Sequence, residues 1–215
     1  WITRVLFSPD GKYLVTASYD GTVNILDAIT GKEISKPLVS YSEIVNDLAF
    51  RPDGAILAIA PYDDSGKIEL WNMETNPPQL LQTLAGSRES PVYSLAFSPD
   101  GKLLASGSAD GVIILWNVEN LTDADIRQPL FGHQGTVFSI VFSSDGKTLA
   151  SGSADKTVIW WDVGTGGILG TLSGHTSAVS RVDFSPDGKT LAAAGNDGII
   201  ILWDMDFELW RAQAC

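Results

Sequence analysis

A phenylalanine followed by a tight-turn sequence recurs along this chain at intervals of 43, 47, 45 and 42 residues, at Phe7, Phe50, Phe97, Phe142 and Phe184. The turn reads SPDGK at 8–12, 98–102 and 185–189, and closely related sequences follow the other two phenylalanines. Proline presets φ for the first turn position and glycine supplies the positive φ that closes a hairpin. Intervals of this length suit a repeated unit of four short strands, so the sequence predicts an all-β repeat fold.

The strand expected before each turn carries an extra residue. Its apolar positions advance by three and then by two, as in Val92, Leu95 and Phe97. A regular strand alternates in steps of two, so the pattern indicates a β-bulge, which re-aims side chains at sheet rims. A second turn then begins at an aspartate in every repeat, at Asp20, Asp63, Asp110, Asp155 and Asp197. The following strand ends in Trp-Asp or Trp-Asn in the last four repeats.

These motifs resemble WD40 repeats, and the resemblance runs from Ile2 to about Asp204. It implies a single all-β domain over 1–215, a β-propeller of WD40 type with five four-stranded units at about 1–38, 39–84, 85–131, 132–172 and 173–215. Rings of this family most often have seven blades. We therefore expect an arc of a larger ring, whose remaining blades come from a parent chain or from another copy. Residues 205–215 either form the outer strand of the last unit or begin a helix.

A Ser-His-Asp set in the fourth repeat has two interpretations. In the family, a His, a Ser or Thr, an Asp and a Trp form a hydrogen-bonded structural tetrad, which this sequence matches with His133, Ser151, Ser153, Asp155 and Trp161. A catalytic triad needs an exposed nucleophile beside an oxyanion hole, which nothing in the sequence marks. The fifth repeat keeps the spacing with His175, Asp197 and Trp203, but Ala193 and Gly195 stand where the serines would be. We therefore predict a structural tetrad and no enzyme activity.

The tetrad weakens toward the N-terminus. The third repeat has Arg88 at the histidine position, and the second has Tyr41 there with an Asp63 turn longer by two residues. The first has Leu26 in place of the tryptophan. Fewer polar groups then hold the loops, so we expect repeats four and five to be the stiffest and repeats one and two to be looser.

Composition narrows the choice of partners. With 14 basic and 26 acidic side chains the formal charge is −12, which repels nucleic acid and anionic membrane surfaces. A single cysteine, Cys215, suits a reducing compartment, so we expect a cytoplasmic protein. The two histidines and one cysteine do not have the spacing of a metal site, and we expect no cofactor. The chain begins at Trp1 without an initiator methionine, which suggests a piece of a longer protein.

Bulge residues are the best candidates for partner contact. The bulge would direct residues of each repeat to the rim where the entering loops lie, and we predict a binding surface from Arg4, Asp47, Tyr93, Phe138 and Arg181, with Arg88 and Tyr62 as second choices. Aromatic residues and arginine are enriched in interface hot spots. The expected partner is a protein or peptide, and self-association through open blade edges is a further expectation.

The resemblance implies a non-catalytic scaffold or sensor domain of a larger, signalling protein. The segment 205–210 resembles the tail of large bacterial WD-repeat proteins. The alternative is an enzyme, or a propeller that binds a carbohydrate or small ligand in a central pocket. That alternative predicts charged residues converging on the axis, and only Arg4, Asp47 and Arg181 are candidates.

Overall fold

The computed structural model describes residues 1–34, 37–86, 90–120 and 125–205, and all their regular structure is β-strand. The strands form five antiparallel sheets in chain order, which we call blades 1 to 5. Blades 1 and 2 contain β1 (Ile2–Phe7), β2 (Tyr13–Ser18), β3 (Thr22–Asp27), β4 (Val39–Ser40), β5 (Val45–Phe50), β6 (Ile56–Pro61), β7 (Ile68–Asn72) and β8 (Gln79–Leu84). Blades 3 to 5 contain β9 (Val92–Phe97), β10 (Leu103–Ser108), β11 (Ile113–Asn117), β12 (Asp125–Leu130), β13 (Val137–Phe142), β14 (Thr148–Ser153), β15 (Val158–Asp162), β16 (Ile168–Leu172), β17 (Val179–Phe184), β18 (Thr190–Gly195) and β19 (Ile200–Asp204).

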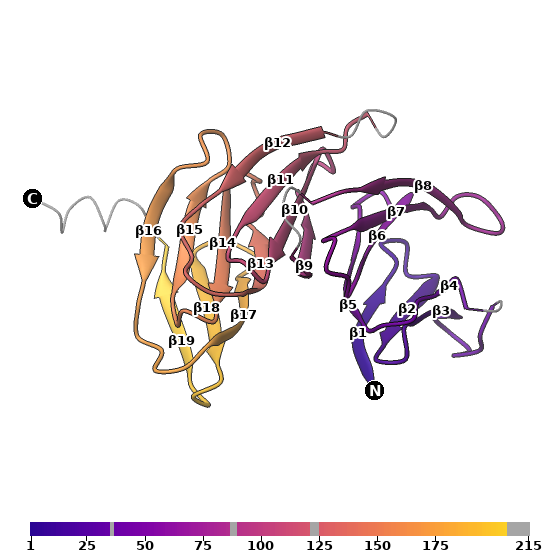
Figure 1. The fold of residues 1–215 in the computed structure, drawn as a ribbon, viewed down its shortest axis with the longest axis horizontal. Coiled ribbons are helices and arrows are strands. Elements are labelled where there is room, and N and C mark those ends of the chain that lie inside the picture. The colour runs from indigo at the N-terminus through magenta and orange to yellow at the C-terminus, as the bar shows by residue number, and fades with distance from the viewer. Residues whose placement is uncertain (35–36, 87–89, 121–124, 206–215) are drawn as a thin grey trace, which may run out of the picture.

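The expected all-β propeller architecture is confirmed, and the blades lie side by side in an arc (Figure 1). In blades 1 to 4 the first strand, β1, β5, β9 or β13, lies next to the first strand of the following blade. Blades 1 to 4 have four strands each, and blade 5 has three among the described residues. The strand or helix expected from 205–215 falls almost wholly on residues outside the described part of the chain.

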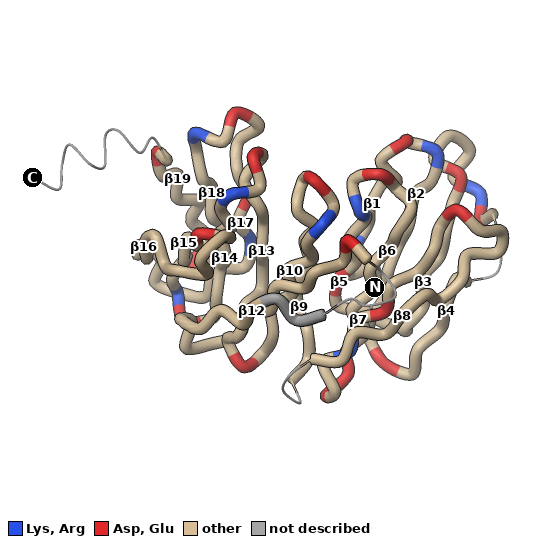
Figure 2. The backbone as a smooth tube through the Cα atoms, turned by 90° about the horizontal axis from the view of Figure 1, so that it is seen from above, with Lys and Arg blue, Asp and Glu red and all other residues tan. Residues whose placement is uncertain are grey.

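The turns behave as their sequences predict. The glycine of each first turn has a positive φ between 69° and 76°, as at Gly11 and Gly101. Asp100 accepts hydrogen bonds from the hydroxyl of Ser98 at 2.6 Å and from the backbone N–H of Lys102 at 3.1 Å, which fixes the loop. Charged residues gather in such turns at the strand ends (Figure 2).

The apolar core lies between blades rather than inside any one of them. Val15 and Val23 of blade 1 pack in one cluster with Leu48 and Leu57 of blade 2, and equivalent clusters join every later pair of blades. A single four-stranded sheet cannot bury both of its apolar faces, and stacking neighbours does so.

At the two ends of the arc, apolar side chains that are buried in the inner blades are exposed. Val5 and Phe7 of β1 are 51% and 64% exposed, and Ile200 and Leu202 of β19 are 70% and 65% exposed. The residues equivalent to Val5 in blades 2 to 5 are at most 6% exposed, because a preceding blade covers them.

Candidate functional site

The predicted bulge is present in every blade. The pairing between the first two strands shifts by one residue in each case, leaving Thr3, Asn46, Tyr93, Phe138 and Ser180 as the extra residues. Their side chains therefore leave the regular alternation of the strand at the end of the sheet where the entering loops lie.

Three aromatic rings meet at this end of the molecule. Tyr93 makes edge-to-face contacts with Phe138 of the next blade, at 5.7 Å between ring centroids, and with Tyr62 of the preceding blade, at 6.3 Å. Tyr62 is 37% exposed, and Tyr93 and Phe138 are half-buried. We call Tyr62, Tyr93 and Phe138 the aromatic rim. Tyr19, which the repeat motifs did not indicate, occupies the same repeat position as Tyr62, is 53% exposed and contacts Trp1 at 5.9 Å between ring centroids.

In blades 2, 3 and 4, the residue after the bulge ties its blade to the next one. The hydroxyl of Ser94 accepts a hydrogen bond from the N–H of Ile140 at 3.0 Å, and Ser139 accepts one from Val182 at 3.1 Å. Asp47 occupies the same position in blade 2, and its carboxylate accepts the N–H of Leu95 at 2.8 Å. We call these contacts the interblade ties.

Arg4 and Asp47 are an ion pair, with Arg4 Nε 2.9 Å from Asp47 Oδ1. Asp47 is only 4% exposed, and burial raises the pKa of its carboxyl while the charge of Arg4 opposes that rise. Because both residues bind each other across the boundary of blades 1 and 2, neither belongs to the partner surface proposed below. Arg88, a second choice for that surface, lies outside the described residues.

A central channel of about 340 Å³ runs among the first strands of all five blades. Its lining includes Arg4, Arg181 and Asp183 together with the tie residues Ser94 and Ser139. Burial and the nearby charge of Arg4 lower the pKa of Arg181. The charged side chains here are two arginines and one exposed aspartate, with the Asp47 carboxylate buried behind Arg4.

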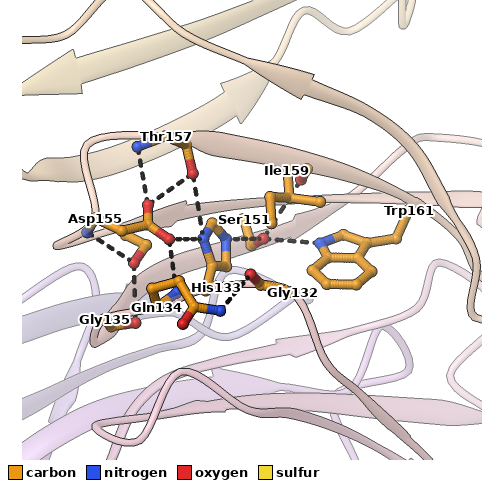
Figure 3. A network of polar contacts seen from close by, with 10 residues as sticks. Gly132, His133, Gln134, Gly135, Ser151, Asp155, Thr157, Ile159 and Trp161 are labelled. Atoms are coloured by element: carbon orange, nitrogen blue, oxygen red, sulfur yellow. Dashed lines mark hydrogen bonds and ion pairs between the residues drawn. The ribbon is translucent and has the colours of Figure 1, made fainter.

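Blade 4 contains a continuous hydrogen-bonded chain (Figure 3). His133 contacts Asp155 Oδ2 through Nδ1 and Ser151 Oγ through Nε2, both at 2.8 Å, and Trp161 Nε1 donates to the same hydroxyl at 2.8 Å. Ser153 stands beside the chain, where its hydroxyl donates to Gly135 O at 2.9 Å. The chain joins the loop entering the blade to β14, to β15 and to the turn between them.

Burial lowers the pKa of His133 below its usual 6.5, against the opposing effect of Asp155. The ring is therefore neutral near pH 7, with Nδ1 donating to Asp155 and Nε2 accepting from Ser151. Burial also opposes ionisation of Asp155, but hydrogen bonds from Thr157 and from the N–H of Gln134 outweigh it and lower its pKa to about 2. Ser151 and His133 are both buried, which is the setting of a structural contact and not of an exposed nucleophile.

Blade 5 keeps half of this arrangement. His175 Nδ1 lies 3.0 Å from Asp197 Oδ2, and its ring contacts Trp203 at 6.3 Å. His175 Nε2 is buried without a hydrogen-bond partner, because Ala193 replaces the serine. In blade 3, Trp116 Nε1 donates to Ser106 at 2.9 Å.

Blade 2 has a network of its own that the sequence analysis missed. The hydroxyl of Tyr41 donates to Glu69 Oε2 at 2.5 Å, and Trp71 Nε1 donates to the same oxygen at 3.1 Å. Lys67 Nζ lies 3.8 Å from Glu69 and 5.4 Å from the centre of the Tyr41 ring. Blade 2 therefore has other polar groups in place of the tetrad. We expected it to be looser because it lacks the tetrad, and these groups remove the reason for that expectation.

The profile of the family described as "WD domain, G-beta repeat" matches residues 1–27, 78–117, 125–162 and 166–204, more than half of the chain. The chain belongs to the WD40 repeat family. The profile leaves 28–77 of this WD40 chain unmatched, and that span includes most of blade 2.

Curated WD40 relatives match about half of the chain. The human WD repeat and SOCS box-containing protein 1 is 33% identical over 110 residues, which are 51% of this chain and 25% of the relative. The WD repeat-containing protein SL1-17 of Schistosoma mansoni is 39% identical over 107 residues, which are 49% of this chain and 33% of the relative. The matched part of this chain thus spans between a quarter and a third of these relatives.

Both relatives are eukaryotic, so the resemblance to bacterial WD-repeat proteins is not supported. The 205–210 segment that suggested it lies, apart from Met205, outside the described residues. In the described part of the WD40 chain, no helix is long and apolar enough to cross a membrane. The same residues contain no group of three or more His, Cys, Asp or Glu side chains placed to hold a metal ion.

Proposed function

We propose that this WD40 chain is a non-catalytic scaffold that binds a protein or peptide partner on the aromatic rim. The observation that supports it is the contact of Tyr62, Tyr93 and Phe138, which come from blades 2, 3 and 4 and are partly exposed to solvent. Aromatic side chains supply large contact area with few rotatable bonds, which makes them frequent anchors in protein interfaces. The single cysteine fits a cytoplasmic location, and a signalling role is part of this proposal.

A rigid base supports such a surface. Tyr93 and Phe138 are bulge residues, and the tie residues Ser94 and Ser139 follow them directly in the chain. The ties fix the backbone beneath each ring, so little conformational entropy is lost when a partner binds. The alternative of a small ligand in the central channel has weaker support, because Arg4 is already paired with Asp47.

The test begins with peptides selected from a randomised 12-residue phage library on the immobilised chain. Replacing Tyr93 and Phe138 by alanine should weaken the binding of selected peptides by more than about 1 kcal/mol for each ring that acts as an anchor. Ile29→Ala is the control, because Ile29 is 93% exposed in a turn of blade 1 outside the aromatic rim. Titration by fluorescence polarisation measures all three proteins.

Unchanged affinity in the Tyr93→Ala/Phe138→Ala variant would contradict the proposed surface.

The proposal that the chain is non-catalytic has a test of its own. Turnover of an ester or peptide that disappears in His133→Ala, in a variant that stays folded, would show that the blade 4 histidine is catalytic.

A further inference from the structure

A pocket of about 340 Å³ opens directly beside the aromatic rim, in blade 2. Its aromatic walls are Tyr41 and Tyr62, and its charged groups are Glu43, Asp63, Asp64 and Lys67. Tyr62 belongs to both the pocket and the aromatic rim, so a single short segment of a partner can reach both.

The pocket is negatively charged. It contains three carboxylates and one ammonium group, a formal balance of −2. Lys67 Nζ lies 3.5 Å from Asp63 Oδ2 and 3.8 Å from Glu69 Oε1, so its positive charge is already paired with carboxylates of the chain. Glu43 and Asp64 are exposed acidic residues of the lining outside these two ion pairs.

The chain itself shows that this environment accepts a cation. Lys67 Nζ stands over the Tyr41 ring, where the negative face of the aromatic system attracts positive charge. Glu69 holds the Tyr41 hydroxyl, and the indole of Trp71 holds Glu69, so the wall of the pocket is fixed before any ligand enters.

The pocket is a departure from the common WD40 blade. Tyr41 stands at the tetrad histidine position, Glu69 stands where blades 3 to 5 have isoleucine, and the Asp63 turn is two residues longer than its counterparts. All of these residues fall within 28–77, the span that the family profile leaves unmatched.

We propose that this pocket receives a lysine or arginine side chain of the partner, with an adjacent apolar residue of the same segment on the aromatic rim. The proposal rests on the proposed function and specifies the chemistry of the partner. A cationic side chain gains from the Glu43 and Asp64 carboxylates and from the Tyr62 ring, since Lys67 already covers the Tyr41 ring, while a carboxylate there meets like charge.

The experiment compares two charge-neutralising double variants in the full chain. Glu43→Gln/Asp64→Asn removes the exposed charge of the pocket. Glu33→Gln/Glu74→Gln makes the same change in charge at exposed sites outside the pocket and serves as the matched control. Both are titrated with a fluorescent peptide selected on the wild-type chain, and with a copy in which each Arg is replaced by citrulline and each Lys by norleucine.

We expect selected peptides to pair Lys or Arg with a neighbouring apolar residue. Glu43→Gln/Asp64→Asn should weaken the charged peptide about fivefold or more at low salt, since each exposed ion pair contributes up to about 1 kcal/mol. The control variant should stay within about twofold, and the neutral copy should not distinguish wild type from Glu43→Gln/Asp64→Asn.

Two kinds of failure are separable. Peptides that depend on Tyr93 and Phe138 but contain no basic residue, or that bind Glu43→Gln/Asp64→Asn as tightly as wild type, overturn the pocket and leave the proposed function standing. Failure to recover any peptide that depends on the aromatic rim contradicts both.

Discussion

His133 and His175 occupy the same place in successive blades, and their surroundings differ by one hydroxyl group. Ser151 accepts from Trp161 and completes the bonding of His133, while Ala193 leaves His175 Nε2 buried without a partner. Leaving a buried polar group unpaired costs about 1–3 kcal/mol, so blade 5 carries a defect that blade 4 lacks.

Ala193→Ser should therefore raise the free energy of unfolding by about 1 kcal/mol, by placing a hydroxyl within reach of His175 Nε2. The converse change in blade 4, Ser151→Ala, should lower it by about 1–3 kcal/mol. Urea denaturation followed by tryptophan fluorescence measures both variants.

Gly195 provides the control, because it is the other position where blade 5 lacks a serine. A Cβ there would lie 2.4 Å from His175 Nδ1 and 2.6 Å from Asp197 Oδ1, so Gly195→Ser should destabilise the chain. Equal effects of Ala193→Ser and Gly195→Ser would show that the orphaned nitrogen is not the cause.

At the scale of the strand, the bulges of blades 3 and 4 have two effects. The bulge residue itself is free to reach solvent, as Tyr93 and Phe138 do, and the next residue is turned toward the neighbouring blade. Blades 3 and 4 use a neutral serine for the tie, and blade 2 uses a buried aspartate that also pairs with Arg4.

Asp47→Ala should lower the free energy of unfolding by about 2–4 kcal/mol, because it leaves the N–H of Leu95 without its acceptor and the guanidinium of Arg4 without its counter-ion. Asp47→Ser should cost clearly less, since serine supplies the same acceptor in the next two blades. Thermal and urea denaturation compare the two, and equal losses would argue against the tie as the source of stability.

Many features of the strands and turns could be predicted from the sequence, because they depend on the spacing of recurring residues. The turns, the bulges and the positions of His133, Asp155 and Trp161 follow from residues that recur at fixed intervals. Glu69 could not be found this way, since it stands where repeats three to five have isoleucine and its partners are the Tyr41 hydroxyl and the Trp71 indole.

The burial of Asp47 could not be predicted from the sequence either. A charged residue beside a bulge suggests a solvent-facing rim, whereas the packing of blade 2 against blades 1 and 3 encloses it.

At the scale of the whole molecule, the arc presents one apolar sheet face at each end. Exposed apolar faces of this size drive association in water. We expect the chain to self-associate with rising concentration in sedimentation equilibrium, and Phe7→Ser/Leu202→Ser to weaken that association. Ile29→Ser, at an exposed site on neither face, serves as the control. A monomer at every concentration that binds no hydrophobic dye would contradict this expectation.

The ties also give the arc a polarity. In each interblade tie the side chain comes from the earlier blade and the backbone group from the later one, because Asp47, Ser94 and Ser139 each accept an N–H of the next blade. The bulge residues Thr3 and Asn46 point the same way, donating to Val45 O and Val92 O. One end of the arc therefore matches the other end and not itself, so joining copies is heterologous and yields a closed ring or a helical filament rather than a two-fold dimer. Such a joint would set Arg181, which cannot accept a hydrogen bond, opposite a backbone N–H, so each added copy would meet a weaker seam there than any inside the chain.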